Sequence, residues 1–274
     1  MESHEVQVRG VPIRWLEDGD GDPLVLVHGI PTGPALWRHV APRVRGPRCL
    51  AFEMVGYADS IPAGRDRDIS VARQADYLIG WLDEIGVSRA VLAGRDLGGG
   101  VVQIAAVRRP DRCAGLFLTN AIAYDSWPIP SVKAMRAGGG LVRRLPVGAM
   151  RSLLAPLMLR GHDDRDRARE SLDLHLRPYR EHGGPAALVR QERSLDVRDT
   201  MAVADRLRDL DVPARVVWGE ADQFQKVAYG ERLAWDLNAP LRRIAGGRHF
   251  VPEDHPEIIA EELTALLADV SKAG

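Results

Sequence analysis

The stretch GRDLGGG, residues 94–100, decides the class of fold. It lies between an apolar run, AVLA (residues 90–93), and a segment with helical spacing, VVQIAAVRR (residues 101–109). A strand, a sharp glycine-rich turn and a helix together expose one nucleophilic side chain at the tip of the turn, usually a serine. The tip residue here is Asp96. The sequence therefore predicts either a turn that has lost its nucleophile or a turn that attacks with a carboxylate.

Strand and helix patterns alternate on both sides of this turn. Continuous apolar runs such as residues 24–27 and 116–121 indicate strands buried on both faces of a sheet. Ser70 is a typical N-cap, and apolar residues at helical spacing follow it to about residue 85. The alternation predicts an α/β fold with a mostly parallel, doubly wound sheet. Further strands are expected at residues 6–8, 13–16, 48–52, 90–93, 215–219 and 241–244. Further helices are expected at residues 35–44, 101–109 and 256–270, and another helix is expected to end near residue 237.

The alternation stops after the strand that ends at residue 121. From about residue 126 to residue 207 the chain has helical patterns interrupted by Gly and Pro, without a clear strand pattern. RVVWG (residues 215–219) restarts the strand pattern. The simplest domain organisation is an α/β core formed by residues 1–125 and 208–274, into which a helical cap of residues 126–207 is inserted.

Three polar residues follow predicted strands and are expected to meet at one edge of the sheet. Asp96 follows AVLAG, Asp222 follows RVVWGEA, and His249 lies in GGRHF after the last strand. In a parallel sheet, ligand sites lie at the carboxyl ends of the strands. The chain order is therefore a nucleophile, an acid and a histidine.

Four motifs together resemble the α/β-hydrolase family over essentially the whole chain: HGIPTG, GRDLGGG, WGEAD and GGRHF. The aspartate at the turn narrows this resemblance to epoxide hydrolases and haloalkane dehalogenases. The resemblance implies an α/β-hydrolase fold with an inserted helical cap, and it implies no cofactor and no metal. In similar epoxide hydrolases the proline of the first motif, here Pro31, follows a cis peptide bond.

The resemblance also implies a role for each of five residues. Asp96 would attack an sp3 carbon and form an alkyl ester, because attack on an ester substrate would leave a reactive anhydride. His249 would then activate water, and Asp222 would orient the imidazole and stabilise its cationic form. The backbone N–H groups of Leu97 and Ile30 would form the oxyanion hole.

The leaving group stays open at this point. Leu97 and Ile30 stand where many haloalkane dehalogenases have side chains that donate hydrogen bonds to the halide, and neither can donate one. Epoxide hydrolases usually protonate the epoxide oxygen with two cap tyrosines, and Tyr179 corresponds to one of them. Tyr124 or Trp127, at the entrance of the cap, could donate from another direction. The alternative role for all three aromatic residues is packing within the cap.

Three hypotheses of function follow. The first is a hydrolase that opens an epoxide in an apolar small molecule through an ester on Asp96, and the second is a haloalkane dehalogenase. The third is a non-hydrolytic protein that binds an apolar small molecule, or a cyclase or isomerase that uses Asp96 and His249 as acid and base. A decayed serine position would favour binding alone, whereas the presence of His249 and Asp222 favours catalysis.

The acid of the triad has alternatives. Some dehalogenases carry it after the preceding core strand, where this sequence has Asn120, which cannot act as an anion. This favours Asp222, with Asp125 and Glu220 as weaker substitutes.

Two further polar residues adjoin the motifs. His28 is expected to be a structural residue of its loop and not a base. Arg95, which directly precedes the nucleophile, could pair with Glu53.

Composition predicts a soluble globular protein without a nucleic-acid or membrane partner. Hydrophobic residues make up 45% of the chain and charged residues 27%, and the net charge is -1. These values are ordinary for a globular domain, and so small a net charge produces no field that attracts polyanions. The expected partner is an apolar small molecule, and the expected assembly is a monomer or a homodimer.

Two observations favour a cytoplasmic location. Cys49 and Cys113 adjoin apolar runs and are expected to be buried free thiols, which is typical of a reducing compartment. The first ten residues, MESHEVQVRG, are charged and lack the apolar region of a signal peptide.

Overall fold

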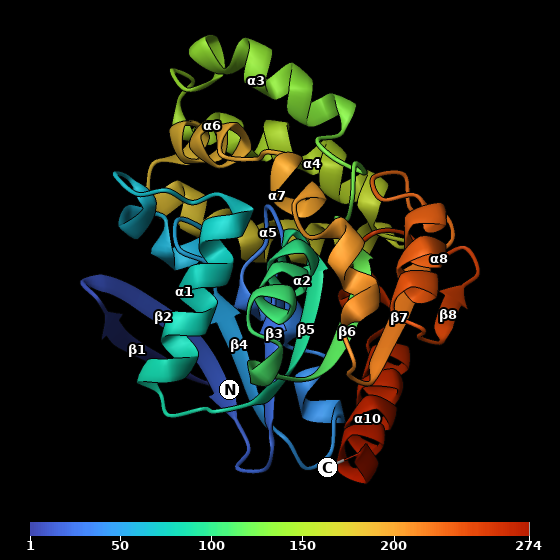
Figure 1. The fold of residues 1–274 in the computed structure, drawn as a ribbon. Coiled ribbons are helices and arrows are strands. Elements are labelled where there is room, and N and C mark those ends of the chain that lie inside the picture. Colours follow the sequence, from blue (N-terminus) through green and yellow to red (C-terminus); the bar gives the residue numbers. More distant parts are fainter. Residues whose placement is uncertain (274) are drawn as a thin grey trace.

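A computed structural model describes residues 1–273 and contains one eight-stranded sheet with helices packed against it (Figure 1). The strand order is β1-β2-β4-β3-β5-β6-β7-β8. The strands are β1 Glu2–Val8, β2 Val11–Asp18, β3 Pro23–Val27, β4 Arg48–Glu53, β5 Ala90–Asp96, β6 Cys113–Ala121, β7 Ala214–Gly219 and β8 Leu241–Ile244.

The sheet is parallel from β4 to β8, and only β1 and β2 run antiparallel to their neighbours. The predicted α/β-hydrolase fold with a mostly parallel sheet is confirmed. The chain passes from β3 outward to β4 and then returns to place β5 on the other side of β3. Such a reversal of strand order leaves a crevice at the carboxyl ends of the two strands. Asp96 is the last residue of β5 and lies at this crevice.

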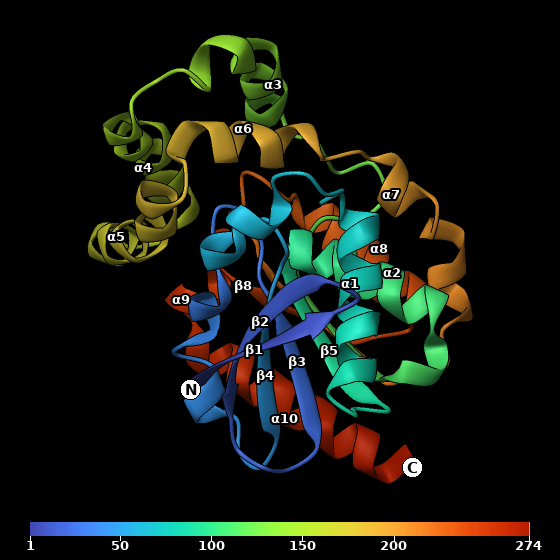
Figure 2. The same ribbon diagram turned by 90° about the vertical axis from the view of Figure 1, so that its left-hand side faces the viewer.

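Two apolar layers cover the sheet because its buried strands carry apolar side chains on both faces. Val25 and Val27 pack with α1 (Val71–Glu84), α2 (Leu97–Arg108) and α8 (Val227–Asp236). Leu24 and Leu26 point to the opposite face and pack with α10 (Pro256–Ala273). This alternation follows from the two-residue period of a strand. Figure 2 shows α1 and α2 together on one side of the strands.

The local signals at two helical segments had different outcomes. Ser70 caps α1 as predicted, and its hydroxyl accepts the Arg73 N–H. The predicted helix at residues 35–44 is wrong. Two short 3-10 turns stand there instead, η1 Pro34–Trp37 and η2 Ala41–Arg43. Pro42 explains the break, since a proline inside a helix removes a hydrogen bond and collides with the preceding turn.

Between β6 and β7 the chain forms only helices, which lie above the carboxyl ends of the strands (Figure 1). This segment, called the helical insertion below, contains α3 Pro130–Val142, η6 Val147–Ala149, α4 Met150–Gly161, α5 Arg165–Glu181, α6 Gly184–Arg193, α7 Arg198–Met201 and η7 Ala204–Asp209. Within residues 1–273, no helix combines the length and the apolar character that a membrane crossing requires.

Remaining short elements are η3 Ala58–Ser60, η4 Pro62–Gly64, η5 Pro110–Arg112 and α9 Val251–Asp254. Of these, α9 bears directly on the site, because it begins two residues after His249 and packs beside η1. The two cysteines, Cys49 and Cys113, are buried free thiols, as the sequence predicts.

Candidate active site

The turn between β5 and α2 holds Asp96 in a strained backbone conformation. Its φ is 53° and its ψ is -122°, a combination that residues with a side chain rarely adopt. Glycines make the turn tight enough: a Cβ on Gly98 would lie 2.2 Å from the Val27 carbonyl oxygen, and one on Gly94 would lie 2.3 Å from the Gly98 carbonyl oxygen. The strain and the close contacts place the Asp96 carboxylate at the crevice between β3 and β5.

Asp96, His249 and Asp222 come together as the sequence analysis expected. Nδ1 of His249 lies 2.8 Å from Oδ2 of Asp222, and Nε2 of His249 lies 3.9 Å from Oδ1 of Asp96. With the Nδ1 proton donated to Asp222, Nε2 of the neutral imidazole carries a lone pair that faces Asp96. All three side chains are buried.

Asp222 is held as an anion by four donors. Its Oδ1 accepts the N–H groups of Phe224 and Gln225 at 2.7 and 3.1 Å, while Oδ2 accepts Asn120 Nδ2 at 2.6 Å and His249 Nδ1. Burial alone raises the pKa of Asp222, but His249, Asn120 and the backbone donors outweigh it and lower the pKa below its ordinary value. Asn120, which cannot serve as the acid, instead orients the residue that can.

The loop after β3 supplies a hydrogen bond to the Asp96 carboxylate. The Ile30 N–H donates to Oδ2 of Asp96 at 2.9 Å, as expected of an oxyanion-hole donor, and the Ile30–Pro31 peptide bond is cis. The Leu97 N–H begins α2 beside Asp96, but among residues 1–273 no hydrogen bond joins it to the carboxylate.

His28 lies in the same loop and is buried. Its Nδ1 lies 2.9 Å from the Gly29 carbonyl oxygen, and its Nε2 accepts the Met54 N–H. Burial lowers the pKa of His28 to about 3, so its imidazole is neutral at physiological pH.

Arg95 is fully buried, directly precedes Asp96 in the chain, and does not pair with Glu53. Its Nε and Nη2 donate to the His249 carbonyl oxygen at 3.2 and 3.1 Å, and its guanidinium lies over the Phe250 ring. Nη1 lies 3.9 Å from Oδ2 of Asp96. Because Arg95 is the penultimate residue of β5, its side chain points away from the Asp96 side and reaches the loop that carries His249. Arg95 thus places one buried cation between Asp96 and the backbone of His249.

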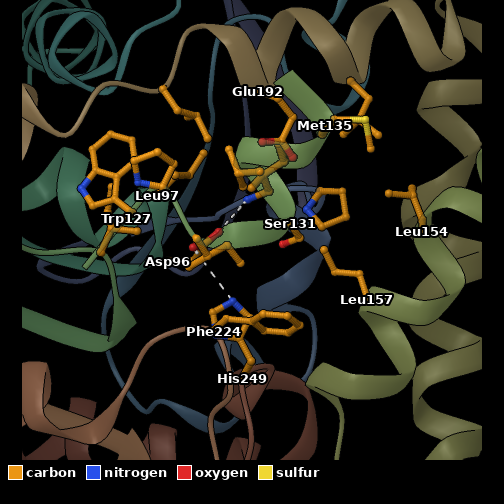
Figure 3. A pocket seen from close by; sticks show the side chains of 18 of the residues that line it. Asp96, Leu97, Trp127, Ser131, Met135, Leu154, Leu157, Glu192, Phe224 and His249 are labelled. Carbon is orange, nitrogen blue, oxygen red and sulfur yellow. Dashed lines mark hydrogen bonds and ion pairs between the residues drawn. The ribbon is translucent and has the colours of Figure 1, made fainter. Parts of the chain in front are cut away.

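A pocket of about 210 Å³ opens above Asp96, between the sheet and the helical insertion. Asp96 and His249 form its floor, and Figure 3 shows both side chains pointing into it. Most of the lining is apolar, and α3, α4 and α6 contribute Val132, Met135, Leu153, Leu154, Leu157 and Leu188 to it. A concave apolar site with a few convergent polar groups is typical of a site for small molecules.

Of the three aromatic residues expected to contact substrate, only Trp127 lines this pocket. Its indole N–H is already donated to Thr200 at 2.7 Å, so it offers the pocket an apolar surface. Tyr124 and Tyr179 lie outside the lining, which corrects the sequence-based expectation. Tyr124 donates its hydroxyl to Asp236, and Tyr179 donates to Gln191. Both hydroxyls serve internal packing.

Sequence analysis missed two ionisable residues of the pocket, the exposed Arg160 of α4 and the buried Glu192 of α6. For Glu192 a signal was present, because Leu188, Glu192 and Leu195 follow one another at intervals of four and three residues, the spacing of one helical face. In the structure α6 ends at Arg193, and Leu195 lines the pocket from just beyond its end. A glutamate between two leucines on a buried face is unusual for a solvated helix.

One group of side chains in residues 1–273 has the spacing of a cation site: Asp59, Glu181 and His182. This group does not line the pocket, and all three of its side chains are at least partly exposed. Arg177 already bonds both carboxylates, at 2.8 and 2.9 Å. This arrangement is that of a surface ion pair.

Comparison with known proteins agrees with this geometry. The family described as alpha/beta hydrolase fold matches residues 22–256, and the chain belongs to that family. The chain is 27% identical to the uncharacterized hydrolase YugF of Bacillus subtilis (strain 168), covering 89% of each. It is 26% identical to a haloalkane dehalogenase of Agrobacterium fabrum, covering 98% of this chain and 92% of the relative.

Among solved structures, an alpha/beta hydrolase fold protein from Burkholderia ambifaria superposes with a TM-score of 0.86 at 29% identity. The match covers 96% of this chain and 97% of the other. The protein is therefore a hydrolase of the α/β fold, with haloalkane dehalogenases among its relatives.

Proposed function

We propose that this hydrolase forms a covalent ester between Asp96 and a small apolar substrate, and that the substrate is an epoxide. The observation that carries the proposal is the state of the two carboxylate oxygens. Oδ2 of Asp96 accepts the Ile30 N–H at 2.9 Å, whereas Oδ1 faces the pocket and lies 3.9 Å from Nε2 of His249. One oxygen is held and the other is free to attack carbon.

The second half of the reaction is hydrolysis of the ester. His249 takes a proton from water through Nε2, and the water oxygen attacks the carbonyl carbon of the Asp96 ester. The gap of 3.9 Å between Nε2 and Oδ1 is too wide for a direct hydrogen bond, and a water molecule can contact both atoms across it. The charge that develops on Oδ2 meets the Ile30 N–H, and such a donor contributes about 3 kcal/mol. The Leu97 N–H is proposed as the second donor in that intermediate.

The helical insertion is proposed to act as the cap, residues 126–207, that closes the pocket. Its apolar lining favours an apolar substrate, and it removes bulk water from the carboxylate. In this surrounding the charge of Asp222 stabilises the imidazolium that forms when His249 takes a proton.

Haloalkane dehalogenase activity is the second candidate, because relatives named as haloalkane dehalogenases match 97–98% of this chain. The pocket favours it less. Leu97 and Ile30 have no side-chain donor for a halide, and the Trp127 indole N–H is occupied by Thr200. An epoxide instead needs a group that protonates its oxygen, and it needs no pair of donors that hold a halide.

The test is to trap the ester. In a His249→Gln variant, the peptide that contains Asp96 should gain the mass of an added epoxide such as styrene oxide, and turnover should fall by about 10²–10⁴-fold because the general base is lost. A His249→Gln, Asp96→Ala variant is the matched control and should gain no mass. In ¹⁸O water, a single turnover of the unmodified protein should place label in the Asp96 carboxylate.

Product analysis distinguishes the candidates. Diol from styrene oxide supports epoxide opening, while bromide release from 1-bromobutane without any diol would replace it by dehalogenation. Absence of both label and adduct with either compound would refute a covalent Asp96 ester.

A further inference from the structure

Glu192 is the buried ionisable side chain that the helical insertion contributes to the pocket. Only 7% of its surface is exposed, and it lines the pocket together with Asp96 and His249. Figure 3 shows Glu192 extending from α6 on the opposite side of Asp96 from His249. Across the described residues 1–273, its Oε2 has no hydrogen-bond partner. An unpartnered buried carboxyl oxygen is costly to the fold and therefore calls for a physical explanation.

Its surroundings keep the Glu192 carboxyl available as a neutral acid. Burial, together with the charge of Asp96, raises the pKa of Glu192 to about 7, against the opposing charge of Arg136 on α3. Arg136 bonds only the Glu192 backbone, since its Nε donates to the carbonyl oxygen at 2.7 Å. The other titratable groups that face it or share its pocket are His249, the exposed Arg160 of α4, and the neutral hydroxyls of Tyr57 and Tyr179.

We propose that Glu192 is the general acid that protonates the oxygen leaving group when Asp96 attacks. This inference rests on the proposed epoxide-opening function. Oδ1 of Asp96 forms a bond to a ring carbon, the C–O bond of the epoxide breaks, and the oxygen takes the Glu192 proton. The products of this step are an ester, a hydroxyl group and an ionised Glu192.

Hydrolysis completes the balance. Water gives one proton to His249 and its hydroxide to the ester carbonyl, so that Asp96 is released as a carboxylate and the diol departs. The proton on His249 then returns to Glu192 by way of water. The sum is one epoxide and one water converted to one diol, with all three side chains restored.

Position and hydrogen bonding both favour Glu192 over other donors. It lies on the opposite side of Asp96 from His249, so the acid that serves the epoxide oxygen and the base that serves the ester carbonyl act from different sides of Asp96. Its Oε2 can donate without breaking an existing bond, unlike the hydroxyl of Tyr179 or the indole of Trp127. The same carboxyl specifies the class of substrate, because a departing halide takes no proton and an ionised Glu192 would repel it.

The experiment compares two electrophiles and two matched glutamates in the His249→Gln background, where the ester accumulates. The rate of ester formation is measured with styrene oxide and with benzyl bromide. Glu192→Gln keeps the side-chain size and removes the acidic proton. Glu53→Gln is the control, because Glu53 is also buried with its pKa raised to about 7 by burial, but lies outside this pocket.

We expect Glu192→Gln to slow ester formation from the epoxide by about 10²–10⁴-fold and to change the rate with benzyl bromide by less than about threefold. With Glu192 present, the epoxide rate should fall as pH rises above about 7, since the neutral carboxyl is the reactive form; this decline should disappear in Glu192→Gln. Glu53→Gln should leave both rates and the profile unchanged.

Two results would overturn the inference while leaving the proposed function intact: an epoxide rate that Glu192→Gln does not alter, or an equal loss with both electrophiles. Absence of any ester with the epoxide when Glu192 is present would refute the proposed function itself, and the role of Glu192 with it.

Discussion

Two buried glutamates, Glu192 and Glu253, have pKa values that are shifted in opposite directions. Glu192 faces the pocket from α6, and burial raises its pKa to about 7. Glu253, on α9 of the core, is fully buried where α4 and α5 meet the core, and its pKa is lowered well below that of an ordinary glutamate. The residue type and the burial are the same, so their partners must account for the difference.

Glu253 lies where the helical insertion meets the core, a contact called the seam below. The side chains around Glu253 there stabilise its negative charge. Ser171 donates to its Oε2 at 2.6 Å, Arg38 bonds its Oε1, and Nε2 atoms of His175 and His162 lie 3.5 and 3.4 Å from the carboxylate. Burial alone raises the pKa of Glu253, but the hydrogen bond from His175 and the charge of Arg38 outweigh it. His175 is itself oriented, because its Nδ1 accepts the Gly33 N–H.

The comparison teaches that burial sets no charge state by itself. At the seam, donors from the insertion and from the core keep the Glu253 carboxyl ionised, and the carboxylate thereby links the insertion to the core. In the pocket, Arg136 is the one cation that lowers the pKa of Glu192, and the carboxyl oxygen is left unbonded toward the substrate. A paired glutamate supports structure, and an unpaired one is available for proton transfer.

The largest effect is expected when the paired glutamate is neutralised. Glu253→Gln leaves Arg38 and the two histidines without their anion and should lower the free energy of unfolding by about 3–5 kcal/mol at pH 7. Urea unfolding measures it. Because the native pKa of Glu253 is lowered, its contribution is present above the ordinary glutamate pKa and should disappear as pH falls through the native value.

Glu257→Gln is the matched control for that experiment. Glu257 is exposed and pairs with Arg43 on the surface at 3.0 Å, so its loss should change stability by no more than about 1 kcal/mol. Equal unfolding midpoints for Glu253→Gln and Glu257→Gln would show that the seam does not fasten the insertion.

An intermediate effect is expected when the unpaired glutamate is neutralised. The native pKa of Glu192, about 7, lies above the ordinary value of 4.5, so the unfolded chain ionises first and ionisation of Glu192 opposes folding as pH rises. Glu192→Gln should therefore be more stable than the unmodified protein by about 3 kcal/mol at pH 8 and no different at pH 4.

Thermal or urea unfolding at the two pH values tests this, with exposed Glu84 replaced by Gln as the control. If the stability gap between Glu192→Gln and the unmodified protein is the same at pH 4 and pH 8, Glu192 does not carry the raised pKa.

Sequence patterns predicted the fold and much of the floor of the site. Continuous apolar runs defined the strands, and a residue placed directly after a parallel strand must lie at its carboxyl end. That local rule brought Asp96, Asp222 and His249 to one edge. Pro42 was a local signal too, and the predicted helix over residues 35–44 does not form because Pro42 interrupts it.

The roof of the pocket could not be predicted in the same way. The spacing of Leu188, Glu192 and Leu195 indicates one helical face, but whether that face lines a pocket depends on how the insertion packs onto the core. Tyr179 was expected to reach substrate on the strength of the resemblance, but its hydroxyl bonds Gln191, whose own amide bonds the Gly56 carbonyl oxygen. Tertiary contacts therefore decide that Glu192 lines the pocket and that Tyr179 does not.

The smallest effect is expected when the positive charge near Glu192 is removed. Arg136 is the cation that lowers the pKa of Glu192, so Arg136→Gln should raise it and move the decline in epoxide-dependent ester formation to higher pH, by less than about one unit. Arg136→Lys keeps the charge and should leave the decline in place. Since the Arg136 side chain also bonds the Glu192 carbonyl oxygen, the Lys variant separates loss of charge from loss of that hydrogen bond. A decline that moves to lower pH in Arg136→Gln, or equally in both variants, would mean that the pocket tunes Glu192 through packing and not through the balance of charge.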